Sequence, residues 1–475
     1  MKVFETEIDL VSALSRLDWI IIFLTFGATW LAALYGARRH RDLPSEGKNA
    51  IVMGRRLTLP LFVATLVATW YGGIFGVTEI AFTQGIFNFV TQGLFWYLAY
   101  VVFAIYLAPK LRSSGASTLP ELVEQRFGPK AQKLASYVNV VNVFPVAYVL
   151  SLGILVRMIT GLDMPIAMLL GIVFILAYNA VGGFAAVVYS DFIQAIIMCI
   201  SVGLVIFFSV TEVGGFTHLK ESLPPHFFTI NGGDSWSMTF VWGFIAFATL
   251  VDPTFYQRCF AATDIKVARN GILISTVIWC VFDLCTTFGG MYAASVIPQA
   301  APREAYMIYA LQVLPDGFRG FFVGGIFATI LSTIDSFSYV AVNTLSHDMK
   351  FSRFFKLKHK WARQFLFSLL VLLASYFIAQ YYDGSFKKIW KSMGSFAAGS
   401  LLVPIVGVML FNRPVSEKRF VAAGIASILA ILGFRTLQAQ LGLFKDIDSL
   451  YVAMLVSLIG CYLLPEAIFR KRIST

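Results

Sequence analysis

The feature that most constrains this chain is a series of long apolar runs, each about the length needed to cross a bilayer. A membrane-spanning helix needs ~20 mostly apolar residues. Only 13% of the residues are charged and 58% are hydrophobic, whereas a soluble domain carries about 25% charged residues. The sequence therefore predicts an all-α polytopic membrane protein and not a soluble enzyme. The thirteen predicted spans cover residues 17–36, 59–84, 89–109, 133–158, 163–181, 185–210, 236–256, 270–293, 317–346, 363–382, 387–411, 418–438 and 448–469.

The distribution of basic residues predicts the orientation of the chain. Lys and Arg number 37 against 26 Asp and Glu, and most of these cations fall in alternate loops, which become cytoplasmic if the N-terminus lies outside. Arg258, after the seventh run, is assigned to one of these loops. We therefore expect a multi-pass protein of the plasma (inner) membrane with its N-terminus outside and its C-terminus cytoplasmic. The excess of Lys and Arg is explained by the orientation of the chain in the lipid bilayer, so no nucleic-acid partner is expected. The acidic residues Glu5, Glu7 and Asp9 argue against a cleaved signal peptide.

Enzymatic and metal chemistry find little support in the motifs. The five cysteines and five histidines form no CxxC pair and no metal-binding spacing. The sequence holds no nucleotide-binding loop and no HExxH motif, so ATP-driven pumping and metalloproteolysis lose support. We expect no enzyme activity, no catalytic residue and no bound organic cofactor.

Two apolar runs carry sequences that break a helix. The second run contains ATWYGG at residues 68–73, and the seventh contains VDPT at residues 251–254, where proline removes a backbone donor. Unwound backbone survives in a bilayer only where protein or water satisfies it. Breaks at matching positions of two halves indicate an inverted-repeat transporter with its substrate beside the breaks. The expected substrate-binding residues are Trp70, Gly72, Gly73, Thr249 and Asp252.

Each break also has a simpler interpretation. The glycine pair is equally explained by close packing of helices, and the Asp-Pro pair by a helix end at the cytoplasmic surface. The coincidence of the two breaks favours the transporter interpretation. Its expected organisation is an N-terminal extra helix and cytoplasmic loop (1–58), a first five-helix repeat (59–210), a second five-helix repeat (211–412) and two C-terminal helices (413–475).

The ninth run places four hydroxyl side chains on one helical face, at spacing i, i+3, i+4 and i+7. Neutral oxygen ligands suit a small, hard, monovalent cation. The alternative is that each hydroxyl bonds a carbonyl of its own helix, one turn back. Asp335 beside them is costly facing lipid, so we expect it to face protein or water. The four hydroxyl residues are Thr329, Ser332, Thr333 and Ser336.

At these places the chain resembles the sodium/solute symporter family, whose members include the sodium/proline and sodium/galactose transporters. The resemblance extends over about residues 17–412 and implies a leucine-transporter-type core, a 5+5 inverted repeat with one helix before it and two after. It rests on RRLTLPLFVATLVATWYGG, STLPELVEQRFG, YNAVGGFAAVVYSDFIQ, DPTFYQRCFAATDIKVARNG and GIFATILSTIDSFSYVAVNTLSHD. The stretch 70–73 lacks the small hydroxyl residues that some members carry at the first break.

The resemblance also implies a sodium site, with Na+ as the coupling ion. The family's ligands fall here on the backbone carbonyls of Ala68, Tyr71 and Thr329 and on the hydroxyls of Ser332 and Thr333. Asp191, near Gln194 at the start of the sixth run, matches a family acidic residue linked to sodium passage or to a second ion site. Its simpler interpretation is solvation at the membrane surface.

Together these features predict a sodium-coupled secondary active symporter that imports a small organic solute by alternating access. Trp70 can sit over an amine and Asp252 can counter a positive group, which favours an amino acid or another amine-bearing metabolite. One alternative is a proton-coupled carrier in which Asp191, Asp335 or Glu79 titrates. Another is a transporter-like membrane sensor that signals to a separate partner. The sequence does not indicate the oligomeric state.

Overall fold

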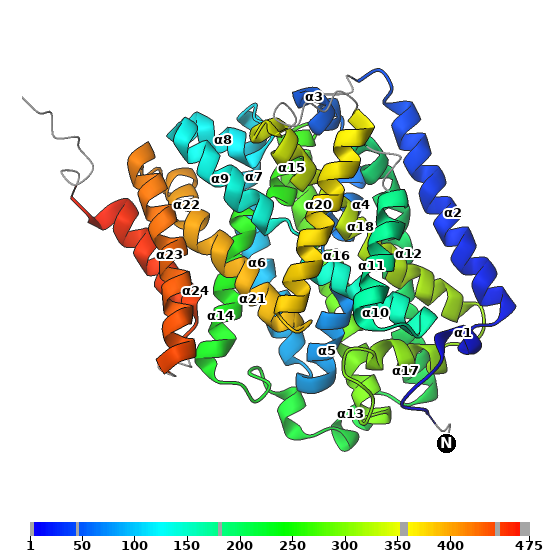
Figure 1. Cartoon of the computed structure of the whole chain (residues 1–475). Helices are drawn as coiled ribbons and strands as arrows, with labels where there is room; N and C mark the ends of the chain where they lie inside the picture. Colours follow the sequence, from blue (N-terminus) through cyan, green and yellow to red (C-terminus); the bar gives the residue numbers. More distant parts are fainter. Residues whose placement is uncertain (1–3, 44–46, 179–182, 352–359, 442–446, 466–475) are drawn as a thin grey trace, which may run out of the picture.

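The computed structural model describes residues 4–43, 47–178, 183–351, 360–441 and 447–465 (Figure 1). The regular secondary structure of these residues is helical, with one isolated bridge that pairs Leu57 with Ala262. The helices up to the middle of the chain are α1 (Leu10–Ala13), α2 (Arg16–Arg39), α3 (Lys48–Ile51), α4 (Leu59–Ala68), α5 (Ile74–Gln84), α6 (Phe95–Val102), α7 (Ala108–Ser113), α8 (Leu119–Phe127), α9 (Pro129–Asn142), α10 (Val146–Thr160), α11 (Met164–Tyr178) and α12 (Phe184–Glu212). They are followed by α13 (Phe216–Ser222), α14 (Trp236–Phe247), α15 (Pro253–Ala261), α16 (Ile265–Val296), α17 (Ala305–Val313), α18 (Phe318–Asn343), α20 (Lys360–Tyr381), α21 (Phe386–Ala397), α22 (Val403–Met409), α23 (Glu417–Leu441) and α24 (Ser449–Leu458).

Ten helices in the described residues are long and apolar enough to cross a membrane. They coincide with ten of the predicted spans. The other three spans coincide wholly or in part with the shorter apolar helices Leu59–Ala68, Met164–Tyr178 and Ser449–Leu463. The predicted polytopic all-helical architecture is therefore confirmed, while the count of thirteen spans stays a prediction.

The predicted break in the second span separates α4 from α5, and residues 69–73 connect the two outside regular helix. Both glycines of the break are close-approach positions. A Cβ on Gly72 would lie 2.6 Å from the Cβ of Thr333, and a Cβ on Gly73 would lie 2.5 Å from the Trp390 ring. Because neither glycine has a side chain, Thr333 of α18 and Trp390 of α21 can pack directly against the backbone of the break.

The predicted break in the seventh span separates α14 from α15. A short 3-10 turn (Ala248–Val251) follows α14, and Asp252 is extended, with φ −77° and ψ 119°. Its side chain caps α15 by accepting from the backbone N–H groups of Thr254 and Phe255, while Tyr256 Oη donates to the freed carbonyl of Leu250 at 2.8 Å. Figure 1 shows that the two broken helices run in opposite senses, with α4 and α15 towards one end and α5 and α14 towards the other.

Helix α18 packs against α2, α12 and α20, and most of its residues are buried. Its N-terminus is fixed by Asp18 of α2, a fully buried carboxylate. One oxygen of Asp18 accepts from the backbone N–H groups of Gly317 (2.8 Å) and Gly320 (2.7 Å). The other accepts from the backbone and hydroxyl of Ser15. One side chain therefore caps two helices and sets the position of the helix that carries the hydroxyl face.

We expect Asp18→Ala to lower the stability of the folded protein by about 3 kcal/mol, since it removes a buried acceptor and orphans several backbone donors. The measurement is the melting temperature of the purified protein in detergent. Asp9→Ala is the matched control, because Asp9 is the exposed N-cap of the short α1. Equal melting temperatures for the two variants would contradict the anchoring role of Asp18.

Candidate functional site

Four oxygen atoms meet where α4 ends against α18. Ser332 Oγ lies 2.8 Å from the carbonyl oxygen of Ala68 and 3.1 Å from that of Thr329. Thr333 Oγ1 lies 2.9 Å from the Thr329 carbonyl and 3.3 Å from the Ala68 carbonyl. All four residues are buried. We call these four atoms the oxygen cluster; they belong to four of the five residues predicted to ligate sodium.

The break makes the Ala68 carbonyl available to this cluster. In a continuous helix it would accept from the backbone N–H of Gly72, four residues on. Here the N–H of Gly72 donates instead to Thr333 Oγ1 at 2.9 Å. The α18 hydroxyls thus replace the hydrogen-bond partners that the Ala68 carbonyl and the Gly72 N–H lose at the break. Buried backbone groups need such partners.

The two interpretations of the hydroxyl face both occur, at different residues. The hydroxyl of Thr329 bonds its own helix, at 2.6 Å from the Gly325 carbonyl, whereas those of Ser332 and Thr333 also reach across to Ala68. The side chain of Tyr71, the fifth predicted ligand, points elsewhere: its hydroxyl donates to Asp283. Sodium ligation by the Tyr71 carbonyl stays a prediction.

Beside the oxygen cluster lies a buried ion pair. Asp191 Oδ2 on α12 is 3.7 Å from Arg258 Nη2 on α15, and both side chains are fully buried. Asp191 also accepts a hydrogen bond from Thr65 Oγ1. The assignment of Arg258 to a cytoplasmic loop is therefore wrong, because the helix continues past the break and carries the guanidinium into the protein interior. Solvation of Asp191 at the membrane surface is also wrong.

The guanidinium of Arg258 connects several helices through hydroxyl groups. Its Nη2 donates to Thr69 Oγ1 (2.6 Å), Ser336 Oγ (2.8 Å) and Thr65 Oγ1 (3.0 Å). The network joins α4, α12, α15 and α18, and Ser336 extends it to the predicted hydroxyl face. The positive charge beside Asp191 is thus supplied by the chain itself. Thr65 and Thr69 lie one turn apart in an apolar helix. This spacing was the sequence signal that a buried polar side chain, here Arg258, contacts that face of α4.

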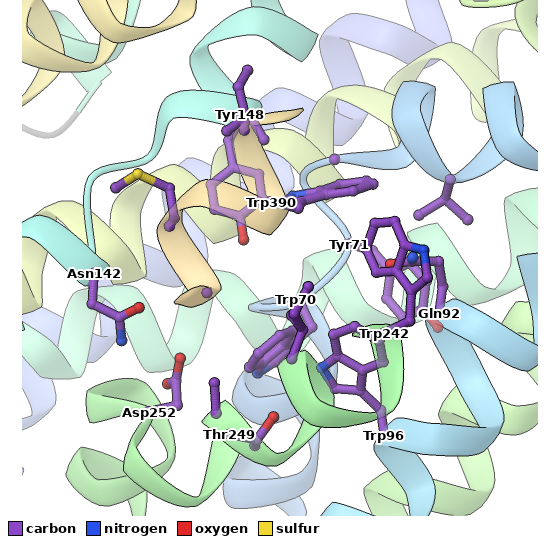
Figure 2. A pocket seen from close by; sticks show the side chains of 18 of the residues that line it. Trp70, Tyr71, Gln92, Trp96, Asn142, Tyr148, Trp242, Thr249, Asp252 and Trp390 are labelled. Atoms are coloured by element: carbon purple, nitrogen blue, oxygen red, sulfur yellow. The ribbon is translucent and has the colours of Figure 1, made fainter. Parts of the chain in front are cut away.

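A cavity of about 150 Å³ lies between the two breaks and the neighbouring helices (Figure 2). Of the predicted substrate residues, Trp70, Gly73, Thr249 and Asp252 line it. Gly72 is not among the lining residues and instead packs on Thr333. The lining also includes Tyr71, predicted as a sodium ligand, and is rich in aromatic rings that the sequence analysis did not single out: Trp96, Tyr97, Tyr100, Phe144, Tyr148, Trp242, Trp279, Phe337 and Trp390.

Several polar groups of the cavity wall are buried without a hydrogen-bond partner within the described residues. They are Trp70 Nε1, Gln92 Nε2 and Thr249 Oγ1. Asp283, on α16, also lines the cavity and accepts from the hydroxyls of Tyr71 and Tyr97. The sequence analysis missed Gln92 and Asp283 because neither lies next to a break. An ionisable residue in the middle of an apolar run was the signal that pointed to Asp283.

Comparison with known proteins gives a consistent result. The model of the sodium:solute symporter family matches residues 51–442. The chain is 29% identical over 292 residues to the high-affinity proline transporter PutP of Bacillus subtilis (strain 168), covering 57% of this chain and 61% of that protein. It is 23% identical over 376 residues to sodium/glucose cotransporter 1 of Oryctolagus cuniculus, covering 67% and 55%. The chain thus matches less than two thirds of the length of each of these two relatives.

Among solved structures, the fold is similar to that of a Na+-coupled sialic acid symporter in a substrate-bound outward-open state. The TM-score is 0.76 at 15% sequence identity, and the match covers 96% of this chain and 98% of the other. At this identity the likeness shows the fold alone. It confirms the predicted leucine-transporter-type architecture.

The buried ion pair generates a test by double-mutant cycle. Arg258→Met leaves the Asp191 carboxylate buried without its cation and should cost about 3–5 kcal/mol. Arg258→Met combined with Asp191→Asn removes both charges, so we expect it to be more stable than the sum of the single changes predicts. Chemical denaturation in detergent measures each free energy. Strict additivity of the two changes would contradict direct coupling of the pair.

Proposed function

This chain belongs to the sodium:solute symporter family, and on that premise we propose that it is a sodium-coupled secondary active symporter that imports a small organic solute. Its family and curated relatives are transporters. It is a multi-pass membrane protein, and we place its N-terminus outside and its C-terminus in the cytoplasm from the loop charges. The proposed five-helix repeats are residues 59–210 and 211–412, and the proposed mechanism is alternating access.

The observation that carries the proposal is the oxygen cluster. Two neutral hydroxyls and two carbonyls converge from α4 and α18, and such a set suits a small hard cation of single charge. The Ala68 carbonyl is free to ligate only because the helix breaks after it. Bound sodium would tie the α4 end of the first repeat to α18 of the second.

The solute is proposed to bind in the cavity beside the two breaks, against Trp70, Gly73, Thr249 and Asp252. A cavity of this volume in another protein takes up a molecule the size of benzene, so the solute is small. Coupling requires sodium and solute to favour each other's binding, with a typical linkage of ~1–3 kcal/mol. The membrane potential contributes about 2.3 kcal/mol per charge per 100 mV, which helps one sodium ion to concentrate the solute.

Asp191 is less suited to a second sodium than to a structural ion pair. Its carboxylate faces the Arg258 guanidinium, and a second cation there would meet a fixed positive charge. We therefore propose one sodium site, at the oxygen cluster.

The proposal predicts that sodium, but not potassium, raises the melting temperature of the purified protein, because an ion that binds only the folded state stabilises it by mass action. Ser332→Ala removes one oxygen of the cluster and should weaken the apparent sodium affinity about tenfold or more, equivalent to ~1.4 kcal/mol.

Ser338→Ala is the matched control, since Ser338 is a buried serine of the same helix whose hydroxyl has no partner within the described residues. It should keep the sodium response of the wild type. Equal stabilisation by potassium, or a sodium response that survives Ser332→Ala unchanged, would contradict the site. A solute response that depends on pH and not on sodium would then favour the proton-coupled carrier.

A further inference from the structure

Two carboxylates line the cavity, and the protein holds them in different ways. Asp252 is engaged as the N-cap of α15: its Oδ1 accepts from Thr254 N (2.8 Å), Thr254 Oγ1 (2.5 Å) and Phe255 N (3.3 Å). A carboxylate at a helix N-terminus is stabilised by the backbone donors and by the helix dipole. The negative charge of Asp252 is therefore partly compensated within the protein.

Asp283 has no comparable compensation. It is 1% exposed, and its two oxygens accept from Tyr71 Oη and Tyr97 Oη, one each. None of the ion pairs found in the described parts of the chain includes it. A buried charge in a membrane protein is costly unless a charge of opposite sign meets it. Asp283 is held by neutral donors and faces a cavity, so it is set to receive a positive charge from a ligand.

The cavity wall around these carboxylates also favours a cation. Within the described parts of the chain, no Lys, Arg or His is among its lining residues. The faces of tryptophan and tyrosine rings attract organic cations, with Trp the most effective, and Trp70, Trp96 and Trp242 all line this space. One basic group packs against a ring of the wall: the Nζ of Lys391 lies 5.6 Å from the centre of the Trp242 ring and 3.5 Å from the sulfur of Met238.

The unpartnered groups indicate a second feature of the ligand. Trp70 Nε1 and Gln92 Nε2 are N–H donors without an acceptor within the described residues, and a ligand oxygen would satisfy them. In Figure 2, Asp252 and Asn142 lie on one side of the Trp70 ring, and Tyr71 and Gln92 lie on the other. The donor Gln92 therefore lies on the same side as Tyr71, whose hydroxyl holds Asp283.

We propose that the solute is a small organic cation that carries an acceptor oxygen, and that Asp283 is the residue that selects its positive charge. This inference rests on the proposed function, in which the cavity is the substrate site. The cation lies against the Asp283 carboxylate and the aromatic faces, and its oxygen accepts from Gln92 or Trp70. Tyr71 and Tyr97 are positioning residues, because they orient the carboxylate through their hydroxyls.

The test compares two probes of nearly equal shape and different charge, choline and its uncharged carbon isostere 3,3-dimethylbutan-1-ol. Binding to the purified full-length protein in sodium is followed by intrinsic tryptophan fluorescence, since several tryptophans line the cavity. We expect choline to bind at least about tenfold more tightly than the alcohol, which corresponds to ~1.4 kcal/mol. Asp283→Asn, nearly isosteric and uncharged, should reduce this ratio to about one.

Asp252→Asn is the matched comparison, because asparagine also caps helices well and the change removes the other carboxylate of the cavity. It should reduce the choline-to-alcohol ratio less than Asp283→Asn does. Equal binding of choline and the alcohol to the wild-type protein would overturn the inference. A preference for choline that survives Asp283→Asn would also overturn it.

Sodium-dependent stabilisation, measured on the same samples without probes, separates this inference from the proposed function. The wild type should show it, and the melting temperature of Asp283→Asn without sodium shows whether that variant is folded. Sodium stabilisation without a preference for the cation would overturn the inference and leave the symporter proposal intact. Loss of sodium stabilisation in the wild type would contradict the symporter proposal itself.

Discussion

The structure depends on how the backbone N–H and C=O groups of a broken helix find hydrogen-bond partners inside a membrane. Unwinding residues 69–73 frees the carbonyl of Ala68 and the N–H of Gly72 from each other, and lipid offers neither a partner. Both groups find hydroxyls on α18: Ser332 and Thr333 reach the carbonyl, and Thr333 accepts from the N–H. The solution to a backbone problem thus produces a cluster of oxygens with the chemistry of a cation site.

Two buried polar features keep α18 in register with the break. Asp18 fixes the N-terminus of α18 to α2, and Arg258 joins Ser336, one turn beyond the oxygen cluster, to Thr69 at the end of α4. An ion at the oxygen cluster would therefore act on α4 and α18, which the Arg258 network already connects and which belong to the two proposed repeats. The cavity proposed for the solute is lined by Trp70, Tyr71 and Gly73 of the break that also frees the Ala68 carbonyl. Ion and solute would therefore contact the same segment, which provides a physical route for reciprocal coupling.

The sequence predicted the features that depend on local pattern and missed those that depend on long-range contacts. Apolar runs, the Gly-Gly and Asp-Pro breaks and the hydroxyl face follow from composition and helical spacing, and the structure contains each of them. Arg258 was misplaced because a basic residue just beyond an apolar run usually lies at the surface, and only the fold brings Asp191 to it. Asp283 and the aromatic cavity arise where helices distant in sequence meet. Gly72 was expected beside the solute, but its missing side chain makes room for Thr333.

The central claim is that a sodium gradient drives solute import through this protein. A solute is first identified by its effect on the tryptophan fluorescence of the protein. The most direct measurement is then the uptake of this solute into proteoliposomes that contain the purified protein. An inward sodium gradient should accumulate the solute above its external concentration, and an inside-negative membrane potential should increase the accumulation. Replacing sodium by potassium should abolish it. Accumulation driven equally well by a proton gradient in the absence of sodium would contradict the account.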